Sequence, residues 1–123
     1  MRYEVTDADT AAAVGSGDVP VLATPRLISW MEAATVQAAA QFTEPGQTTV
    51  GTAVHIEHRR ATRPGGIVEV TAEAPTAAAR RRLSFQVRAI DHSGQLVAVG
   101  QIDRAIVDRD RFLAAISNDD ADQ

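Results

Sequence analysis

The sequence predicts an α+β domain in which one long helix is wrapped by an antiparallel β-sheet. The main helical pattern covers residues 24–41, where Thr24 and Pro25 suit an N-cap and a first helical position. The Glu-Pro-Gly of residues 44–46 ends this helix. Four strand-like runs follow, and the connections between them are short. Short connections join antiparallel neighbours, so we expect a meander.

The other segments complete a single domain over residues 1–117. Residues 2–6 alternate as a short strand, and residues 7–20 form a loop with room for one helical turn. The four long strands are expected at residues 48–62, 66–75, 81–91 and 95–108, with turns at 63–66, 76–80 and 91–95. Residues 109–117 fit a last short helix, and we expect residues 118–123 to be an acidic disordered tail.

The composition excludes several classes of protein. The 123 residues carry a net charge of −4, which argues against a nucleic-acid partner. The chain has no cysteine, which excludes thiolate nucleophiles, disulfides and cysteine-based metal sites. No apolar run approaches the ~20 residues that span a bilayer, and no signal-peptide pattern opens the chain, so we expect a cytoplasmic protein without a membrane partner. Aromatic residues make up only 4%, and this small supply of large side chains favours a homodimer, with a tetramer left open.

Glu32 is an unusual residue within the predicted helix. At 100° per residue, Leu27, Met31, Ala34 and Ala38 form the expected core stripe, and Glu32 falls neither on that stripe nor on the solvent side. No cation lies one turn away, so a salt bridge along the helix does not explain this carboxylate. Two interpretations follow: Glu32 reaches solvent or an arginine of another strand, or it is a catalytic carboxylate in a partly apolar pocket.

The histidines differ in their predicted settings. Strand alternation places His55 on a solvent face and His58 on the opposite face, and a β-bulge would change these assignments. The face of His58 also carries Val50, Thr52, Val54 and Ile56. His58 is either a strand-end histidine beside arginines or a functional residue, and His92 is a turn residue. No histidine and carboxylate have metal-ligand spacing on one helix, so we predict no metal.

Three separated motifs in this order resemble a known family. They are VLATPRLISWMEAA (21–34), EPGQTTVGTAVHIEHRRATRPGG (44–66) and GQIDRAIVD (100–108). They are similar to the hotdog-fold acyl-CoA thioesterases close to the fluoroacetyl-CoA thioesterase family, and the resemblance covers residues 20–112. It implies a hotdog fold, in which an antiparallel sheet wraps one long helix. It also implies hydrolysis of an acyl-CoA thioester to free acid and CoA, without a cofactor other than the CoA of the substrate.

The resemblance also implies a site. The catalytic positions of the family match Thr24, Glu32 and His58, and Gly51 and Arg104 match positions near the substrate. Thioester cleavage needs a nucleophile and donors for the oxyanion, and the sequence leaves open whether Thr24 or Glu32 attacks or activates water. Several arginines are candidates for the CoA phosphates or for a solvated sheet edge. These are residues 59, 60, 63 and 80–82.

One departure from the family concerns the substrate. Fluoroacetyl-selective members have a phenylalanine-rich lid just before the helix, whereas this chain reads GSGDVPVLAT there, with Asp18 and no aromatic residue. This favours a general acyl-CoA hydrolase. Two alternatives are a non-catalytic acyl-CoA-binding hotdog protein and an enoyl-CoA hydratase-like enzyme. The hydratase would use an aspartate and a histidine from one loop, for which Asp91 and His92 are candidates.

Overall fold

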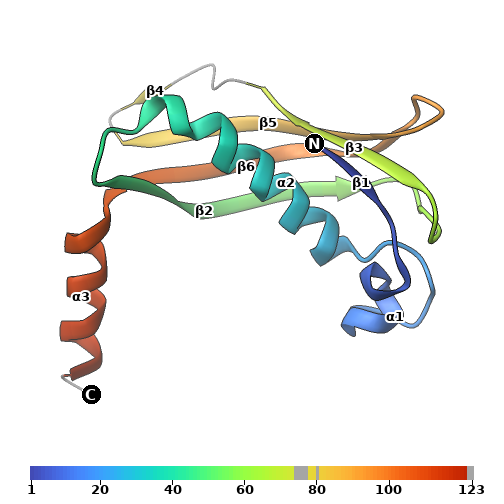
Figure 1. Ribbon diagram of the computed structural model, residues 1–123, viewed down its shortest axis with the longest axis horizontal. Helices are drawn as coiled ribbons and strands as arrows, with labels where there is room; N and C mark the ends of the chain where they lie inside the picture. Colours follow the sequence, from blue (N-terminus) through green and yellow to red (C-terminus); the bar gives the residue numbers. More distant parts are fainter. Residues whose placement is uncertain (74–77, 80, 122–123) are drawn as a thin grey trace.

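The computed structural model describes residues 1–73, 78–79 and 81–121, and it has the predicted α+β architecture (Figure 1). The predicted turn at 76–80 lies largely outside these residues. The sheet order is β1-β3-β5-β6-β2, with β4 beside β5, and every pair is antiparallel. The elements in chain order are β1 (Arg2–Glu4), a 3-10 turn (Asp7–Asp9), α1 (Ala11–Val14), α2 (Thr24–Ala39), a second 3-10 turn (Ala40–Phe42), β2 (Gln47–His58), β3 (Ile67–Ala72), β4 (Ala78–Ala79), β5 (Arg82–Asp91), β6 (Leu96–Asp108) and α3 (Arg109–Ala121).

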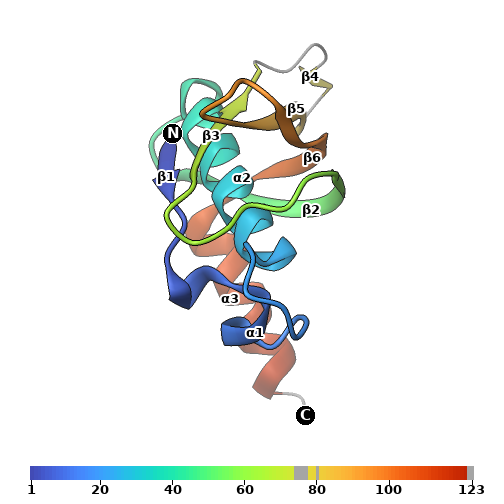
Figure 2. The same cartoon turned by 90° about the vertical axis from the view of Figure 1, so that its right-hand side faces the viewer.

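The core lies between α2 and the face of the sheet that curls around it (Figure 2). Leu27 and Met31 of α2 are fully buried against Phe85 of β5, Ile102 of β6 and Val70 of β3. Each such side chain contributes about 1.5–3 kcal/mol when it leaves water. These contacts fix the position of α2 along the sheet, and therefore the position of every polar residue that the helix carries.

The predicted core stripe of α2 is confirmed except at Ala38. Ala38 is partly buried, while Thr35 and Ala39 are buried in its place. Thr35 tolerates burial because its hydroxyl donates to the carbonyl of Glu32 at 2.7 Å. The α-helix itself ends at Ala39 and continues as one 3-10 turn, close to the predicted end at residue 41.

The meander prediction is right for β3, β5 and β6 and wrong for β2. Strand β2 pairs with β6 at the edge of the sheet, whereas β3 lies on the far side of β5. The connection over residues 59–66 therefore crosses the end of the sheet instead of making a hairpin. The amides of Arg59 and Arg60 donate to the carbonyl of Val97 at 2.8 and 3.2 Å, and Leu22 donates to Thr62 at 2.8 Å. This crossing places the connection beside the start of α2.

Strand β2 contains a bulge near its centre. The consecutive residues Asp103 and Arg104 of β6 pair with Ala53 and Gly51, so Thr52 is an extra residue in β2. An extra residue reverses the alternation of side chains between the two faces of a strand. A residue before Thr52 and a residue after it that would lie on opposite faces of a regular strand therefore lie on the same face of β2.

Because of the bulge, the residues that share a face with His58 differ from those predicted. His58 shares the helix-facing side with Val54 and Ile56, as expected. Beyond the bulge, however, this side continues with Gly51 and not with Val50. His55 is exposed on the opposite face, as predicted.

Helix α3 is longer than the predicted 109–117. It extends to Ala121 and so includes residues 118–121 of the segment that was expected to be a disordered tail. The last two residues lie outside the described part of the chain. Figures 1 and 2 both show α3 projecting past β2, the edge strand, away from the rest of the sheet.

The pairing of β2 with β6 depends on Gly100. A Cβ atom at this position would lie 2.0 Å from the carbonyl oxygen of His55 and 2.9 Å from Cα of Ile56. Both are backbone atoms, so only separation of the strands would relieve the overlap. We expect Gly100→Ala to lower the free energy of unfolding by about 1–3 kcal/mol in urea denaturation. Thr71→Ala on the exposed face of β3 is the control, and equal stability of the two variants would contradict this packing.

Candidate active site

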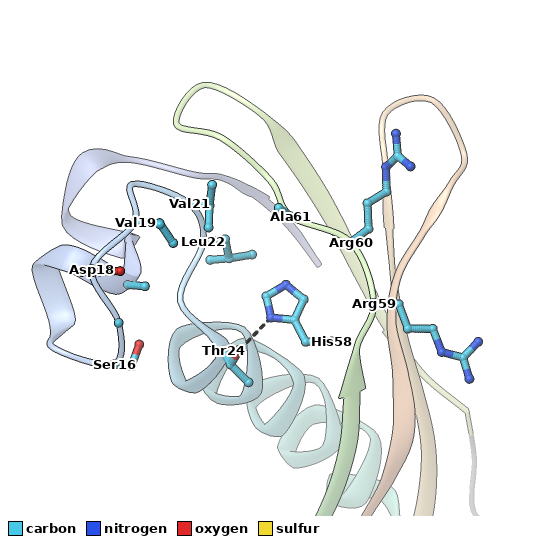
Figure 3. Close-up of a pocket in the computed structure, with 12 residues that line it drawn as sticks. Ser16, Asp18, Val19, Val21, Leu22, Thr24, His58, Arg59, Arg60 and Ala61 are labelled. Carbon is cyan, nitrogen blue, oxygen red and sulfur yellow. Dashed lines mark hydrogen bonds between the residues drawn. The ribbon is translucent and has the colours of Figure 1, made fainter.

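Thr24 lies at the start of α2, but it is not the N-cap that the sequence predicted. The N-cap is Ala23, and Thr24 is already the first helical residue. Its hydroxyl therefore makes no capping bond and instead lies 2.8 Å from Nδ1 of His58, the last residue of β2 (Figure 3). The Thr-Pro pair still starts the helix, because proline is tolerated throughout the first turn.

The His58 ring is suited to accept the proton of Thr24. Burial lowers the pKa of His58 below its ordinary value of 6.5, and the backbone of Arg60 partly opposes this shift. The ring is therefore neutral near pH 7. In the tautomer protonated at Nε2, its Nδ1 accepts a hydrogen bond from the Thr24 hydroxyl. Nε2 is buried and has no hydrogen-bond partner among the described residues.

A cavity of about 330 Å³ opens beside this pair (Figure 3). One wall is the loop between α1 and α2, and the other is the end of β2 with the connection that follows it. The loop contributes Ser16, Asp18 and Val19, and the opposite wall contributes Arg59 and Arg60. Within the described part of the chain, no aromatic side chain lines this cavity.

Glu32 belongs to a second polar group, on the middle of α2. Its carboxylate lies 3.7 Å from Nη1 of Arg104, which is buried on β6, and its own side chain is 40% exposed. Glu32 thus pairs with an arginine of another strand, which was one of the two interpretations of this residue. Burial lowers the pKa of Arg104, and the charge of Glu32 opposes this shift. Arg104 remains a cation, since arginine is not deprotonated in proteins.

Thr49 holds Arg104 in place, a contact that no pattern in the sequence predicts. The guanidinium donates from Nε to the Thr49 hydroxyl at 2.9 Å and from Nη2 to the Thr49 carbonyl at 3.1 Å. This pairing depends on the bulge in β2, which turns Thr49 toward α2. A bulge has no clear signature in this sequence, so the contact was not predictable.

Gly51 makes room for the Glu32 carboxylate. A Cβ at this position would lie 2.9 Å from Oε2 of Glu32 and 3.5 Å from Nη1 of Arg104. The structure thus brings Gly51 and Arg104 to Glu32, and it brings His58 to Thr24. Thr24 and Glu32 are eight residues apart on one helix, a rise of about 12 Å. Among the described residues, no hydrogen bond or ion pair joins the two groups.

The other candidate residues have structural partners. The Asp91 carboxylate accepts from the amides of Ser93 and Gln95 at 2.9 and 3.0 Å and pairs with Arg60. The turn bonds from Gln95 and Ser93 and the charge of Arg60 lower the pKa of Asp91, although burial opposes them. Asp91 thus stabilises the β5–β6 turn, and nothing here favours the hydratase alternative.

The candidate CoA-binding arginines are distributed along the sheet. Arg59 pairs with Glu57 at 3.2 Å, and Arg81 pairs with Asp108 at 3.5 Å. Within the described residues, no group of three potential ligands could hold a metal ion. No helix in the same part of the chain is long and apolar enough to cross a membrane.

The helix wrapped by an antiparallel sheet and the similarity to solved thioesterases place the chain among the hotdog-fold acyl-CoA thioesterases, the class that the sequence predicted. The chain belongs to the fluoroacetyl-CoA-specific thioesterase family, whose model matches residues 5–110. The fluoroacetyl-CoA thioesterase of Streptantibioticus cattleyicolor is 38% identical over 96 residues, which are 78% of this chain and 68% of that protein.

Solved structures support the same assignment. A point mutant of the fluoroacetyl-CoA-specific thioesterase, in complex with fluoroacetate and CoA, superposes with a TM-score of 0.86 at 32% identity, over 97% of this chain and 96% of that chain. A thioesterase superfamily member from Thermus thermophilus has a TM-score of 0.88 at 27% identity, over 96% and 86% of the two chains. The predicted fold and the predicted class of enzyme are confirmed.

The pH dependence of catalysis should follow His58. If its neutral ring accepts the proton, activity is present above its pKa in the folded enzyme and is lost as the pH falls through that value. We expect kcat/KM to be constant near pH 7 and to fall with an apparent pKa below 6.5. His55→Asn, on the exposed face, should leave the profile unchanged. A fall centred above 6.5 would assign the profile to a different group.

Gly51→Ala should act through the Glu32 carboxylate. The added methyl meets the end of a flexible side chain, so the carboxylate moves and the backbone stays. We expect kcat/KM to fall by about tenfold to a hundredfold with little change in Tm. In a Glu32→Asp background, the shorter side chain leaves room, so adding Gly51→Ala should have little further effect. Additive losses in this double-mutant cycle would show that Gly51 acts independently of Glu32.

Proposed function

We propose that this enzyme hydrolyses short acyl-CoA thioesters at the Thr24–His58 pair, without strong selectivity for fluoroacetyl-CoA. The observation that carries the proposal is the 2.8 Å contact between the Thr24 hydroxyl and Nδ1 of His58 at the edge of a cavity. A paired hydroxyl and neutral imidazole form the arrangement that activates an oxygen nucleophile. A protein that only binds acyl-CoA has no need of this pair.

The proposed chemistry starts with proton transfer to His58. As the oxygen of Thr24, or of a water held by Thr24, attacks the thioester carbonyl, its proton passes to Nδ1. The C–S bond then breaks, and the imidazolium returns the proton to the departing CoA sulfur. If Thr24 attacks, water releases the acid from the threonine ester by the same sequence. In the first turn of α2, the backbone N–H groups of Thr24 and Arg26 have no partner within the helix and are suited to stabilise the oxyanion, whereas Pro25 has no N–H.

Arg59 and Arg60 are proposed contacts for the CoA phosphates. Both line the wall of the cavity that begins at His58. Their side chains are about half exposed, at 52% each, so each guanidinium can reach a ligand outside the cavity. Guanidinium groups bind phosphate through two parallel hydrogen bonds, which favours them for this role.

The second polar group of the site is proposed to act across a homodimer. Strand β2 is a long edge strand, and Val54 on its helix-facing side is 43% exposed, which favours pairing with a second copy. Within one protomer Gly51 and His58 are seven residues apart, about 23 Å along a strand. Full-length antiparallel pairing of β2 with itself sets the partner's Gly51 opposite Val54, about 13 Å from His58.

This assembly joins Thr24 and His58 of one protomer to the partner's Glu32 and Arg104. The carboxylate and guanidinium would then face the acyl group from the side opposite the Thr24 hydroxyl. This arrangement gives Glu32 and Arg104 a role in binding the acyl group or the attacking water. A cytoplasmic location, expected from the sequence, is part of the same proposal.

Thiol release from acyl-CoA esters tests the proposal. We expect turnover of acetyl-CoA and propionyl-CoA, and a kcat/KM for fluoroacetyl-CoA within about tenfold of that for acetyl-CoA, since one fluorine gives an unspecialised pocket little to grip. Thr24→Val should reduce kcat by about a hundredfold or more, and Thr24→Ser should retain measurable activity. Tm should be nearly unchanged in both variants, because Thr24 is not the helix cap.

Three other outcomes would contradict parts of this proposal. Tight CoA-ester binding without thiol release would indicate a binding protein. Loss of enoyl absorbance without thiol release would indicate a hydratase. Normal turnover by Thr24→Val would remove Thr24 from the chemistry and leave Glu32 and His58 as candidates.

A further inference from the structure

Helix α3 carries an apolar stripe that its own protomer does not cover. Phe112, Leu113 and Ile116 are 37%, 53% and 43% exposed. The side of α3 that faces its own sheet is centred elsewhere: Arg111 and Ala115 line a cleft with β6, and Phe112, at the border of the stripe, also lines it. At 100° per residue, Leu113 points away from that cleft, and Ile116 lies between Leu113 and Phe112. Exposed apolar residues at neighbouring helical positions mark a contact surface.

The start of α3 and the cavity lie at opposite ends of β2. The amide of Arg109 donates to the carbonyl of Gly46 at 3.0 Å, and Gln47, the first residue of β2, pairs with Asp108. The cavity begins at His58, the last residue of the same strand. Figure 1 shows this separation, with α3 at one end of the edge strand and α1 near the other.

Antiparallel self-pairing of an edge strand exchanges its ends. When β2 pairs with a second copy along its full length, Gln47 of one protomer lies opposite His58 of its partner. The partner's α3 then starts beside the cavity of the first protomer. Both views show α3 extending past the β2 edge, which is the side where the partner lies (Figures 1 and 2).

The wall of the cavity has apolar side chains that match the stripe. Val19, in the loop between α1 and α2, lines the cavity and is 51% exposed, and nearby Val14 of α1 is 38% exposed. Neither is covered by an aromatic lid within the described part of its own chain. An apolar helix and an apolar loop, each incompletely buried, gain free energy when they cover each other.

We propose that α3 of each protomer covers the acyl cavity of its partner. Leu113 and Ile116 of α3 then pack against the partner's Val19, and Phe112 of α3 lies at the rim of the cavity. The inference rests on the proposed dimer and adds a partner segment that completes the binding site. It means that the acyl group is enclosed by a helix of the other chain. A short apolar acyl group fits such an enclosure better than a charged one.

Cross-linking tests this contact without any need for catalysis. The chain has no cysteine, so single cysteines can be placed cleanly. A Val19→Cys chain is mixed with a size-tagged Leu113→Cys chain, allowed to exchange subunits, and treated with a short bismaleimide. We expect a covalent heterodimer with Leu113→Cys and little with the control Ala114→Cys, which lies on the other side of α3. Equal cross-linking of the two, or none in a dimer confirmed by light scattering, would overturn the proposal.

Subunit complementation tests the functional consequence. A Leu113→Glu/Ile116→Glu chain should lose about tenfold or more in kcat/KM, because a charged helix no longer covers the apolar loop. When this chain is mixed with a Thr24→Val chain, half of the dimers contain one chain of each kind. Each mixed dimer has one site in which an intact Thr24 lies under the intact α3 of the partner. The mixture should therefore show about a quarter of the wild-type rate. No recovery would show that α3 acts on its own chain. Ala114→Glu is the control and should keep wild-type activity.

The two tests separate this inference from the proposed function. Cross-linking through Val19 and Leu113 in an enzyme that releases no thiol would retain the assembly and reject the thioesterase chemistry. Thiol release by a monomer would retain the chemistry and reject the helix contact.

Discussion

The site depends on one extra residue in an edge strand. Thr52 bulges out of β2, and the alternation of side chains reverses there. His58 beyond the bulge and Thr49 and Gly51 before it therefore face α2 together. Without the bulge, Thr49 would face solvent and Arg104 would lose the two acceptors that allow its burial. The bulge thus couples the packing of β2 on β6 to the placement of both polar groups of the site.

The core then sets the distance between those groups. Leu27 and Met31 lock α2 against the sheet, so Thr24 meets the end of β2 and Glu32 meets its centre. The helix is rigid over this span, and no side-chain movement brings a threonine hydroxyl to a carboxylate about 12 Å along the axis. In the proposed dimer, the partner supplies the second of these groups to the thioester. The exposed edge of β2 and the exposed stripe of α3 are the surfaces available for that partner.

The sequence was informative where local chemistry decides the structure. The periodicity of α2, the strand runs and the turn around Asp91 were all predictable, and the family resemblance singled out Thr24, Glu32 and His58 as candidate site residues. Long-range features were not predictable. Strand β2 pairs with β6 because backbone amides after His58 bond to Val97, a contact between residues far apart in sequence. Thr24 looked like an N-cap because a Thr-Pro pair suits the N-cap and the first helical position. In the structure the same pair occupies the first and second helical positions instead.

Glu32 is not needed to make the burial of Arg104 tolerable. Thr49 already accepts two hydrogen bonds from the guanidinium, with its hydroxyl and its carbonyl. The Glu32 carboxylate lies 3.7 Å from Nη1, beyond hydrogen-bond range, and is 40% exposed. A partly exposed ion pair of this kind contributes about 0–1 kcal/mol to stability. Stability therefore does not explain why a glutamate stands at this position or why Gly51 leaves space for it, and both are explained if the carboxylate faces a ligand across the β2 edge.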